Sequence, residues 1–275
     1  MNKAYSMNRL ETLIVSNLER IPLVSFYVRT RGWHYVLSWC HRITAIILVL
    51  YLWFHLYTLS SLHTPEVYNW KMGIMFMPVV VFFAWLSSVP VIFHALNGGR
   101  LILYESFGDR NDESMVRWTL YLCFVYVAIL GILIFMENQT VSAIFFWLVM
   151  IVASLAVTFG VAAKIWKSQH TVFWKMQRIT GAFLLIAVPA HLLFSHLNPS
   201  VAIDAQMVIA RMQNWFIKIV DLLLAFSVIY HSGYGLFSIA ADYIRLRILR
   251  IAIAGVIVLL SAIFLIIALR IVFTI

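Results

Sequence analysis

Seven long stretches of mostly apolar residues dominate the chain, and short segments between them hold most of its charges. Each stretch is long enough for a helix that crosses the hydrocarbon core of a bilayer, which takes about 20 residues. The pattern therefore predicts an all-α membrane protein with about seven transmembrane helices. We expect them at residues 34–62, 70–96, 116–136, 141–163, 171–194, 207–239 and 251–275. The longest connection, residues 97–115, is interpreted as a solvated loop.

Composition supports a membrane environment for most of the chain. Hydrophobic residues make up 63% of the 275 residues and charged residues 11%, whereas a soluble domain has roughly 45–50% apolar and 25% charged residues. The basic residues lie singly between apolar runs, which is typical of membrane loops rather than of a nucleic-acid-binding surface. Cys40 and Cys123 both lie in apolar runs, which excludes a disulfide scaffold and a cysteine-ligated cluster.

The distribution of Lys and Arg predicts the orientation in the membrane. Counted over seven spans, fourteen of these residues lie on the side of the N-terminus and three on the other side. Because basic residues concentrate in cytoplasmic segments, we expect a multi-pass protein of the cytoplasmic (inner) membrane with its N-terminus in the cytoplasm. Residues 1–33 hold five Lys and Arg and no continuous apolar stretch, so a cleavable signal peptide is not expected.

Several features recur in the two halves of the chain at an offset that is constant to within one position. The tetrapeptide RITA is matched by RITG, a histidine stands thirteen residues after each of their arginines, and an H-x-x-x-G segment occurs in each half. The matched residues are Arg42 and Arg178, His55 and His191, His94 and His231, and Gly98 and Gly235. The offset spans four helices, an even number, so the repeat is parallel.

This repeat predicts the organisation of the chain. Residues 1–33 form a cytoplasmic N-terminal segment, residues 34–136 the first three-helix repeat, and residues 166–275 the second. A three-helix unit ends on the far side of the membrane, so a fused second unit needs one extra span to return the chain. Residues 137–165 supply that linking helix.

Four histidines within the predicted spans are the main candidates for chemistry. A histidine inside a membrane is costly unless it has a partner. The helical rise of about 1.5 Å per residue places one histidine from each half near the cytoplasmic side and one from each half toward the outside. These pairs are His94 with His231, and His55 with His191.

Two facing imidazoles at each of two depths predict axial ligation of two stacked haem b groups, with a single haem as the alternative. Gly98 and Gly235 lie on the same helical face as His94 and His231, where a missing side chain would let a flat macrocycle approach. For any single histidine, an interhelical hydrogen bond remains the alternative. Zinc is disfavoured, because no carboxylate or thiol stands at helical spacing from the histidines.

The ordered set of motifs resembles the cytochrome b membrane anchor of succinate:quinone oxidoreductases, the complex II and fumarate reductase family. The resemblance covers most of residues 34–247. Single-chain anchors of that family have five helices, so the two additional helices suggest either a fused large and small anchor or a five-helix anchor with an inserted hairpin. The segments that carry it are Ser38-x-x-His41-Arg42-Ile43-Thr44, His94-x-x-x-Gly98-x-Arg100 followed by Glu105, Met176–His191, and His231-x-x-x-Gly235 followed by Asp242-Tyr243.

The resemblance implies that this chain performs no dicarboxylate chemistry. A flavoprotein subunit and an iron–sulfur subunit would dock on the cytoplasmic side, and electrons would pass between the clusters and a quinone, with haem as a relay. Another two-haem cytochrome anchor of a respiratory dehydrogenase, or a heptahelical receptor or transporter without haem, remains an alternative. No nucleic acid is expected as a partner.

Quinone reduction needs hydrogen-bond donors for the carbonyl oxygens and a route for protons. Ser38, Arg42 and Tyr243 are the candidate donors, with Asp242 beside them. For Arg42 the alternatives are snorkelling or a haem propionate, and Asp242 could instead pair with a nearby arginine. Two further residues, His41 and Arg178, are candidate partners of haem propionates. The alternatives are an interfacial position for His41 and snorkelling to the interface for Arg178.

Overall fold

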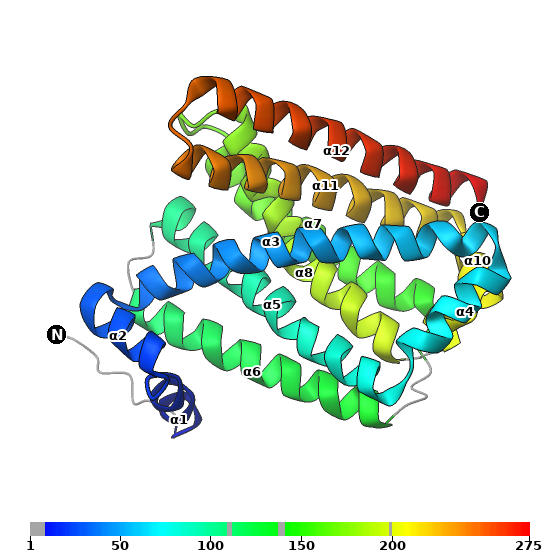
Figure 1. Ribbon diagram of the computed structural model, residues 1–275, viewed down its shortest axis with the longest axis horizontal. Coiled ribbons are helices and arrows are strands. Elements are labelled where there is room, and N and C mark those ends of the chain that lie inside the picture. Colours follow the sequence, from blue (N-terminus) through cyan, green and yellow to red (C-terminus); the bar gives the residue numbers. More distant parts are fainter. Residues whose placement is uncertain (1–8, 109–111, 137–140, 198–199) are drawn as a thin grey trace.

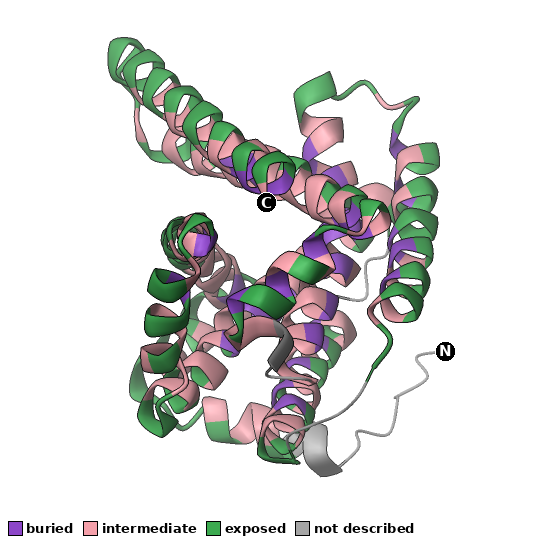
Figure 2. Ribbon diagram, turned by 90° about the vertical axis from the view of Figure 1, so that its right-hand side faces the viewer, coloured by how far each residue is buried: buried purple, intermediate pink, exposed green. Residues whose placement is uncertain are grey.

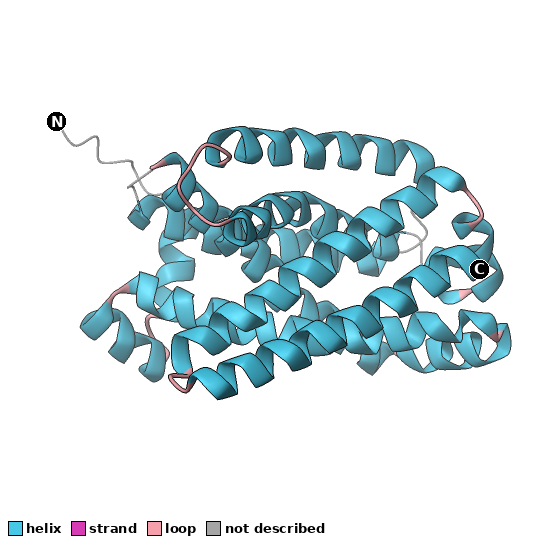
Figure 3. Ribbon diagram, turned by 90° about the horizontal axis from the view of Figure 1, so that it is seen from above, coloured by secondary structure: helices cyan, strands magenta, loops and turns pink. Residues whose placement is uncertain are grey.

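Helices provide all the regular secondary structure in the computed structural model over residues 9–108, 112–136, 141–197 and 200–275, which are the residues it describes (Figure 3). Seven of these helices are long and apolar enough to cross a membrane. They are α3 (Trp33–Ser60), α5 (Pro78–Ile102), α6 (Asp112–Met136), α7 (Ala143–Ile165), α8 (Val172–Leu197), α11 (Trp215–Tyr243) and α12 (Arg247–Thr274). The predicted class, an all-α multi-pass membrane protein, is confirmed.

Two predicted spans begin too early, because each includes a short separate helix. Residues 70–96 run from α4 (Pro65–Met75) into α5, and the helix breaks before Pro78, whose ring and missing N–H are suited to a helix start. Residues 207–239 likewise run from α10 (Ala205–Met212) into α11. There the Asn214 side chain accepts hydrogen bonds from the backbone N–H groups of Phe216 and Ile217 and caps the new helix.

The prediction of a solvated loop at residues 97–115 is wrong over residues 97–107 and 112–115, which are helical, while residues 109–111 lie outside the described residues. Helix α5 continues through Gly98 and Gly99, a π-helical turn η2 follows (Leu103–Phe107), and the chain leaves it at Gly108 with a φ of 71°. The left-handed conformation at Gly108 ends the helix, since a residue without Cβ adopts it readily. Asn97 and Arg100 are buried in the helix, where Arg100 Nε donates to Asn97 Oδ1 at 2.9 Å.

Four helices form a closed ring at the centre of the bundle, in the order α3, α5, α8 and α11, with each one packed against the next and α11 packed against α3. Helices α3 and α5 come from the first half of the chain, and α8 and α11 from the second. Three further helices pack on the outside of this ring, α6 on α5, α7 on α8 and α12 on α11. The ring places equivalent helices of the two halves diagonally opposite each other.

The two ends of the bundle differ in character. At the left end in Figure 1, which we call the basic end, helices α3, α6, α8 and α12 begin, and α1 (Arg9–Leu18) and α2 (Pro22–Arg31) lie nearby. At the opposite end, η1 (Ser61–His63), α4, α9 (Ser200–Ile203) and α10 connect the spans. A partly buried hydrogen bond from Tyr68 Oη to the carbonyl of Ala202 joins two of these connections.

Side-chain burial follows the arrangement expected in lipid. Buried positions cluster where helices face one another, whereas the outward faces are largely exposed (Figure 2). Many large apolar side chains lie on those outward faces, including Phe135, Phe159 and Ile248. Exposed apolar surface on this scale is stable only against lipid, since a soluble protein seldom exposes large contiguous apolar patches.

Candidate functional site

The structure brings the first predicted histidine pair together inside the four-helix ring. His94 on α5 and His231 on α11 have ring centres 6.3 Å apart and ring planes at 90°. Their helices are diagonally opposite, so the two imidazoles meet across the centre of the ring. We call these residues the inner histidine pair, because they lie nearer the basic end.

Neighbouring groups on α3 orient His94. Its Nδ1 lies 3.3 Å from the backbone carbonyl oxygen of His41 and 3.3 Å from Thr44 Oγ1. The ring of His41 stacks on that of His94, with centres 3.9 Å apart and planes at 5°. When Nδ1 donates its proton to the carbonyl, Nε2 of His94 is left as a lone-pair donor, which is how proteins prepare histidine for a metal.

The second predicted pair also meets across the ring, toward the opposite end. His55 on α3 and His191 on α8 have ring centres 5.9 Å apart and planes at 86°. The ring of Trp147 on α7 lies 6.2 Å from that of His191, within a buried apolar cluster that also contains Phe194. We call His55 and His191 the outer histidine pair.

Gly98 and Gly235 lie beside polar side chains of the neighbouring helices. A Cβ added at Gly98 would lie 3.6 Å from His41 Cε1, and one added at Gly235 would lie 3.5 Å from Gln177 Nε2. His41 and Gln177 are themselves related by the repeat offset, so the two contacts are equivalent in the two halves. Gln177 was not predicted as a site residue, although its place opposite His41 in the repeat pointed to it.

Polar atoms without partners gather around the inner histidine pair. Among the residues that the structure describes, three buried side-chain atoms near this pair make no hydrogen bond. They are His41 Nδ1, Asn97 Nδ2 and Gln177 Oε1. Buried polar groups are normally satisfied, so these atoms indicate a place where a polar ligand group completes the structure.

The four candidate quinone residues lie together at the basic end. Arg42 connects them, because its Nη1 donates to Ser38 Oγ at 2.5 Å and its Nη2 to Asp242 Oδ2 at 3.0 Å. The guanidinium carbon lies 5.9 Å from the ring centre of Tyr243. Asp242 therefore pairs with Arg42 on the facing helix.

Arg178, a candidate propionate partner, forms an ion pair that was not predicted from the sequence. Its Nε and Nη2 donate to Glu105 Oε2 at 3.0 and 2.5 Å, and its guanidinium lies 4.6 Å from the ring centre of Trp174. Glu105 and Asp242 are separated by the same offset as His94 and His231. That offset was the signal from which the Arg178–Glu105 pair could have been predicted.

A partly buried cation at the opposite end was also not predicted. Arg211 on α10 lies with its guanidinium 5.5 Å from the ring centre of Phe194, and its Nε has no hydrogen-bond partner in the described part of the chain. Burial lowers the pKa of Arg211, while Asp221 and Tyr68 oppose that shift. Burial raises the pKa of Tyr68 to about 12. Arg211 belongs to no repeated feature or motif, so its partly buried position could not be predicted from the sequence.

The described residues contain no group of three or more His, Cys, Asp or Glu side chains that could hold a metal ion by themselves. The two histidine pairs offer two imidazoles each. That donor set fits a metal whose remaining ligands come from a cofactor.

Comparison with known proteins identifies the family. A family model described as the succinate dehydrogenase/fumarate reductase transmembrane subunit matches residues 31–134 and 158–269, two stretches that contain the two sets of matched residues. The succinate dehydrogenase 2 membrane subunit SdhC of Mycobacterium tuberculosis is 34% identical over 83 residues, which is 29% of this chain and 61% of that protein. The chain thus spans about three fifths of the length of this curated relative. No solved structure matches the chain. Because the family model covers most of its length, the chain belongs to the family of succinate dehydrogenase/fumarate reductase transmembrane subunits.

Proposed function

We propose that this chain anchors a succinate:quinone oxidoreductase in the cytoplasmic membrane, binds two haem b groups, and passes electrons between an iron–sulfur subunit and a membrane quinone. The observation that carries the proposal is the presence of two histidine pairs. At each of two depths, one imidazole from each half of the chain meets its equivalent across the four-helix ring, at 6.3 Å for the inner pair and 5.9 Å for the outer pair.

These separations suit axial ligation of haem iron. An imidazole nitrogen binds a metal ion at about 2 Å and the ring centre lies about 1 Å beyond it, so two imidazoles that share one metal ion would have ring centres about 6 Å apart. A haem macrocycle would supply four nitrogens to its iron, and two histidines would supply the remaining ligands. Near the inner pair, the unpartnered nitrogens His41 Nδ1 and Asn97 Nδ2 could donate hydrogen bonds to the carboxylates of such a group.

When bound, haem b supplies an iron that accepts and releases one electron at a time. The residues of this chain hold and orient it. His94 with His231, and His55 with His191, would each bind the iron of one haem through their imidazole nitrogens, and the contact with the His41 carbonyl orients the ring of His94. His41 and Arg178 are the proposed partners of the inner propionates, with Glu105 balancing the charge of Arg178.

We assign the quinone head group to the cluster of Ser38, Arg42, Asp242 and Tyr243. The hydroxyl groups and the guanidinium supply donors for the carbonyl oxygens of a quinone. The Asp242 side chain is half exposed and bonded to Arg42. A carboxylate in that position can take protons from water at the basic end and deliver them next to the quinone, which needs two protons for each reduction.

The basic end is the proposed docking side for the flavoprotein and iron–sulfur subunits. The excess of Lys and Arg on this side supports a cytoplasmic location for it, together with the N-terminus. Both the inner histidine pair and the quinone cluster lie toward this end. Electrons from a docked iron–sulfur subunit would therefore reach the quinone cluster without crossing the membrane.

The test is a count of haem b per polypeptide in the purified complex. We expect about two haems in the unchanged protein, one after His55→Ala or His191→Ala, and one after His94→Ala or His231→Ala. His170→Ala is the matched control, because its exposed ring stacks on Trp174 outside both pairs. A protein without haem, or a haem content that none of the four substitutions changes, would refute the proposal.

A further inference from the structure

Arg211, in the last turn of α10, lacks an anionic partner of the kind that the arginines at the basic end have. Arg42 and Arg178 form ion pairs with acids from the other half of the chain. The Arg211 side chain is partly buried, and its Nε is buried and makes no hydrogen bond within the described residues. A cation out of water is costly unless an anion compensates it, so this position points to an anionic group that binds there.

The two ionisable side chains that act on Arg211 do not fully compensate its burial. Burial lowers the pKa of Arg211, and Asp221 and Tyr68 oppose this shift without cancelling it. Tyr68 donates its hydroxyl proton to the carbonyl of Ala202 and stays neutral below its raised pKa of about 12. Asp221 accepts no hydrogen bond from Arg211 Nε, which is unpartnered among the described residues. A further anion next to Arg211 would therefore complete the site.

Hydrogen bonding and packing hold α10, and with it Arg211, at this end of the bundle. The Asn69 side chain on α4 accepts a hydrogen bond at 2.9 Å from the backbone N–H of Ala205, at the start of α10. Val208 and Met212 on α10 are buried in a cluster with side chains of α4 and α12. The C-terminal end of a helix also carries partial negative charge, which favours a cation there. The fold therefore keeps this arginine against the bundle.

Aromatic rings connect Arg211 to the outer histidine pair. Its guanidinium carbon lies 5.5 Å from the ring centre of Phe194, and the Phe194 ring lies 6.0 Å from that of Trp147. The Trp147 ring in turn lies 6.2 Å from the ring of His191. Phe194 follows His191 by three residues on α8, so both lie on the same face of that helix. Arg211 therefore borders the surroundings of the outer pair on the side away from the basic end.

The group proposed at the outer pair brings an anion of the right kind. A haem b macrocycle carries two propionate carboxylates at its edge, whereas axial imidazoles lie above and below its centre. Partners of the carboxylates must therefore lie beside a histidine pair, as Arg211 does. An arginine suits this role, because its planar N–H donors can form two parallel bonds with the two oxygens of a carboxylate.

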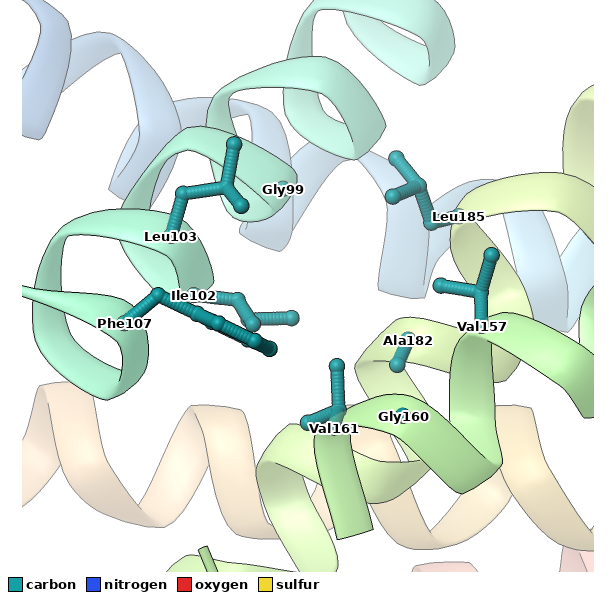
Figure 4. A pocket seen from close by; sticks show the side chains of 9 residues that line it. All are labelled: Gly99, Ile102, Leu103, Phe107, Val157, Gly160, Val161, Ala182 and Leu185. Carbon is teal, nitrogen blue, oxygen red and sulfur yellow. The ribbon is translucent and has the colours of Figure 1, made fainter. Parts of the chain in front are cut away.

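Open space toward the basic end has a different character. A cavity of about 310 Å³ lies between α5, η2, α7 and α8, and Figure 4 shows its two walls, with Leu103 and Phe107 on one side and Val157 and Ala182 on the other. The described residues that line it are all apolar, so a carboxylate has no partner there. Arg211, by contrast, offers a cation and an unpartnered donor next to a histidine pair.

We propose that Arg211 binds a propionate of the haem held by His55 and His191 and raises the midpoint potential of that haem. This inference rests on the proposed function, which supplies the second haem. The iron takes up one electron on reduction, so the bound group loses one positive charge overall. A cation close by favours the reduced form, because it attracts the added electron. Arg211 thereby makes the outer haem a better electron acceptor than it is without this residue.

Substitutions at Arg211 separate its charge from its hydrogen bonds. Arg211→Gln removes the charge and keeps a donor, whereas Arg211→Lys keeps the charge without the planar set of donors. Arg270→Gln is the matched control, because Arg270 is an exposed arginine on α12 at the same end of the bundle. His191→Ala leaves only the inner haem and so identifies the potential of that haem.

The assay is a redox titration of the intact purified complex, followed at the haem absorption bands, together with resonance Raman spectra of the haems. We expect Arg211→Gln to lower the equilibrium constant for reduction of the outer haem about tenfold, which is about 59 mV for a one-electron couple, and to leave the inner haem unchanged. The Raman band of propionate bending should shift in the same variant. Arg211→Lys should retain most of the potential, and Arg270→Gln should change neither haem. Loss of the outer haem alone in Arg211→Gln, with the haem retained in Arg211→Lys, would equally support the proposal.

Three outcomes would overturn this role of Arg211. Unchanged potentials and an unchanged Raman band in Arg211→Gln, with both haems retained, would give Arg211 a different partner, and loss of a bound phosphatidylglycerol from that variant in native mass spectrometry would identify a lipid phosphate. An equal shift of both haems, or the same shift in Arg270→Gln, would show only the loss of a distant charge. Loss of both haems in Arg211→Gln and in Arg211→Lys would show that Arg211 maintains the fold. A single haem that His55→Ala and His191→Ala leave in place would instead refute the second haem of the proposed function, and the role of Arg211 with it.

Discussion

The two ion pairs that join the halves of the chain should differ in strength, and the structure gives the expected order. Arg178 donates two hydrogen bonds to Glu105, and the two side chains are 21% and 33% exposed. Arg42 donates one bond to Asp242, with exposures of 30% and 50%. A hydrogen bond to a charged group contributes about 1.5–3 kcal/mol, whereas an exposed ion pair contributes about 0.2–1 kcal/mol. We therefore expect a coupling free energy of about 2 kcal/mol for Arg178–Glu105 and of less than about 1 kcal/mol for Arg42–Asp242.

Double-mutant cycles measure these two couplings directly. One cycle uses Arg178→Gln, Glu105→Gln and the double variant, and the other uses Arg42→Gln, Asp242→Asn and their combination. The free energy of unfolding is measured for each protein in mixed micelles titrated with a denaturing detergent. Because the pairs are equivalent in the two halves, each cycle serves as the control for the other. Equal couplings, or a larger one for Arg42–Asp242, would refute the argument from exposure and bond number.

Three further predictions test other parts of the structure. Gly131→Ala should lower the free energy of unfolding by about 1–3 kcal/mol, because the new Cβ would lie 2.9 Å from Trp85 Nε1 and overpack the contact between the two helices. Gly255→Ala should leave the free energy of unfolding unchanged, because an added Cβ there meets no atom within 4 Å. The midpoint of thermal unfolding should fall as the pH rises from about 10 to about 12, because the pKa of Tyr68 is raised to about 12 in the folded state and the folded protein therefore binds this proton more tightly than the unfolded chain. The midpoint of the Tyr68→Phe variant should fall less over the same pH range. Ser38→Ala should lower the rate of quinone reduction about tenfold, which corresponds to the loss of about one hydrogen bond, with haem content unchanged.

The meeting of the histidines could be predicted from the sequence because the repeat offset and the helical rise give both their pairing and their depth. His55 and His191 stand at equal distances from equivalent arginines, and the same holds for His94 and His231 relative to Gly98 and Gly235. The pairing of the histidines does not depend on side-chain detail. It follows from the assumption that the two halves pack with equivalent helices facing each other.

Helix boundaries and the Arg178–Glu105 pair could not be predicted in the same way. Gly98 and Gly99 suggest a turn by composition, yet packing against α3 and α8 keeps them helical, with His41 and Leu185 beside them. Extending α5 brings Glu105 to Arg178, a contact that a loop beginning at residue 97 does not suggest. Local propensity thus gave the wrong boundary where tertiary contacts determine the structure.

A single geometric rule accounts for both the histidine pairs and the ion pairs. When two equivalent halves pack around a two-fold axis, a residue on the axis meets its own equivalent, whereas contacts away from the axis occur twice, with the partners exchanged. His94 and His231, on the axis, form one pair with each other. Arg42 and Arg178, away from it, each meet an acid of the other half.

Fusion of the two halves into one chain allows the two off-axis sites to diverge, which a dimer of identical subunits cannot do. Differences between equivalent positions occur at these sites. Where the first has Ser38 and Tyr243, the second has Trp174 and Ser106. One site therefore has a serine beside its arginine, while the other has an indole over its arginine and an apolar cavity next to it. The off-axis positions differ while the four histidines are retained, because a histidine on the axis has its own equivalent as its partner, whereas each off-axis site can change without the other.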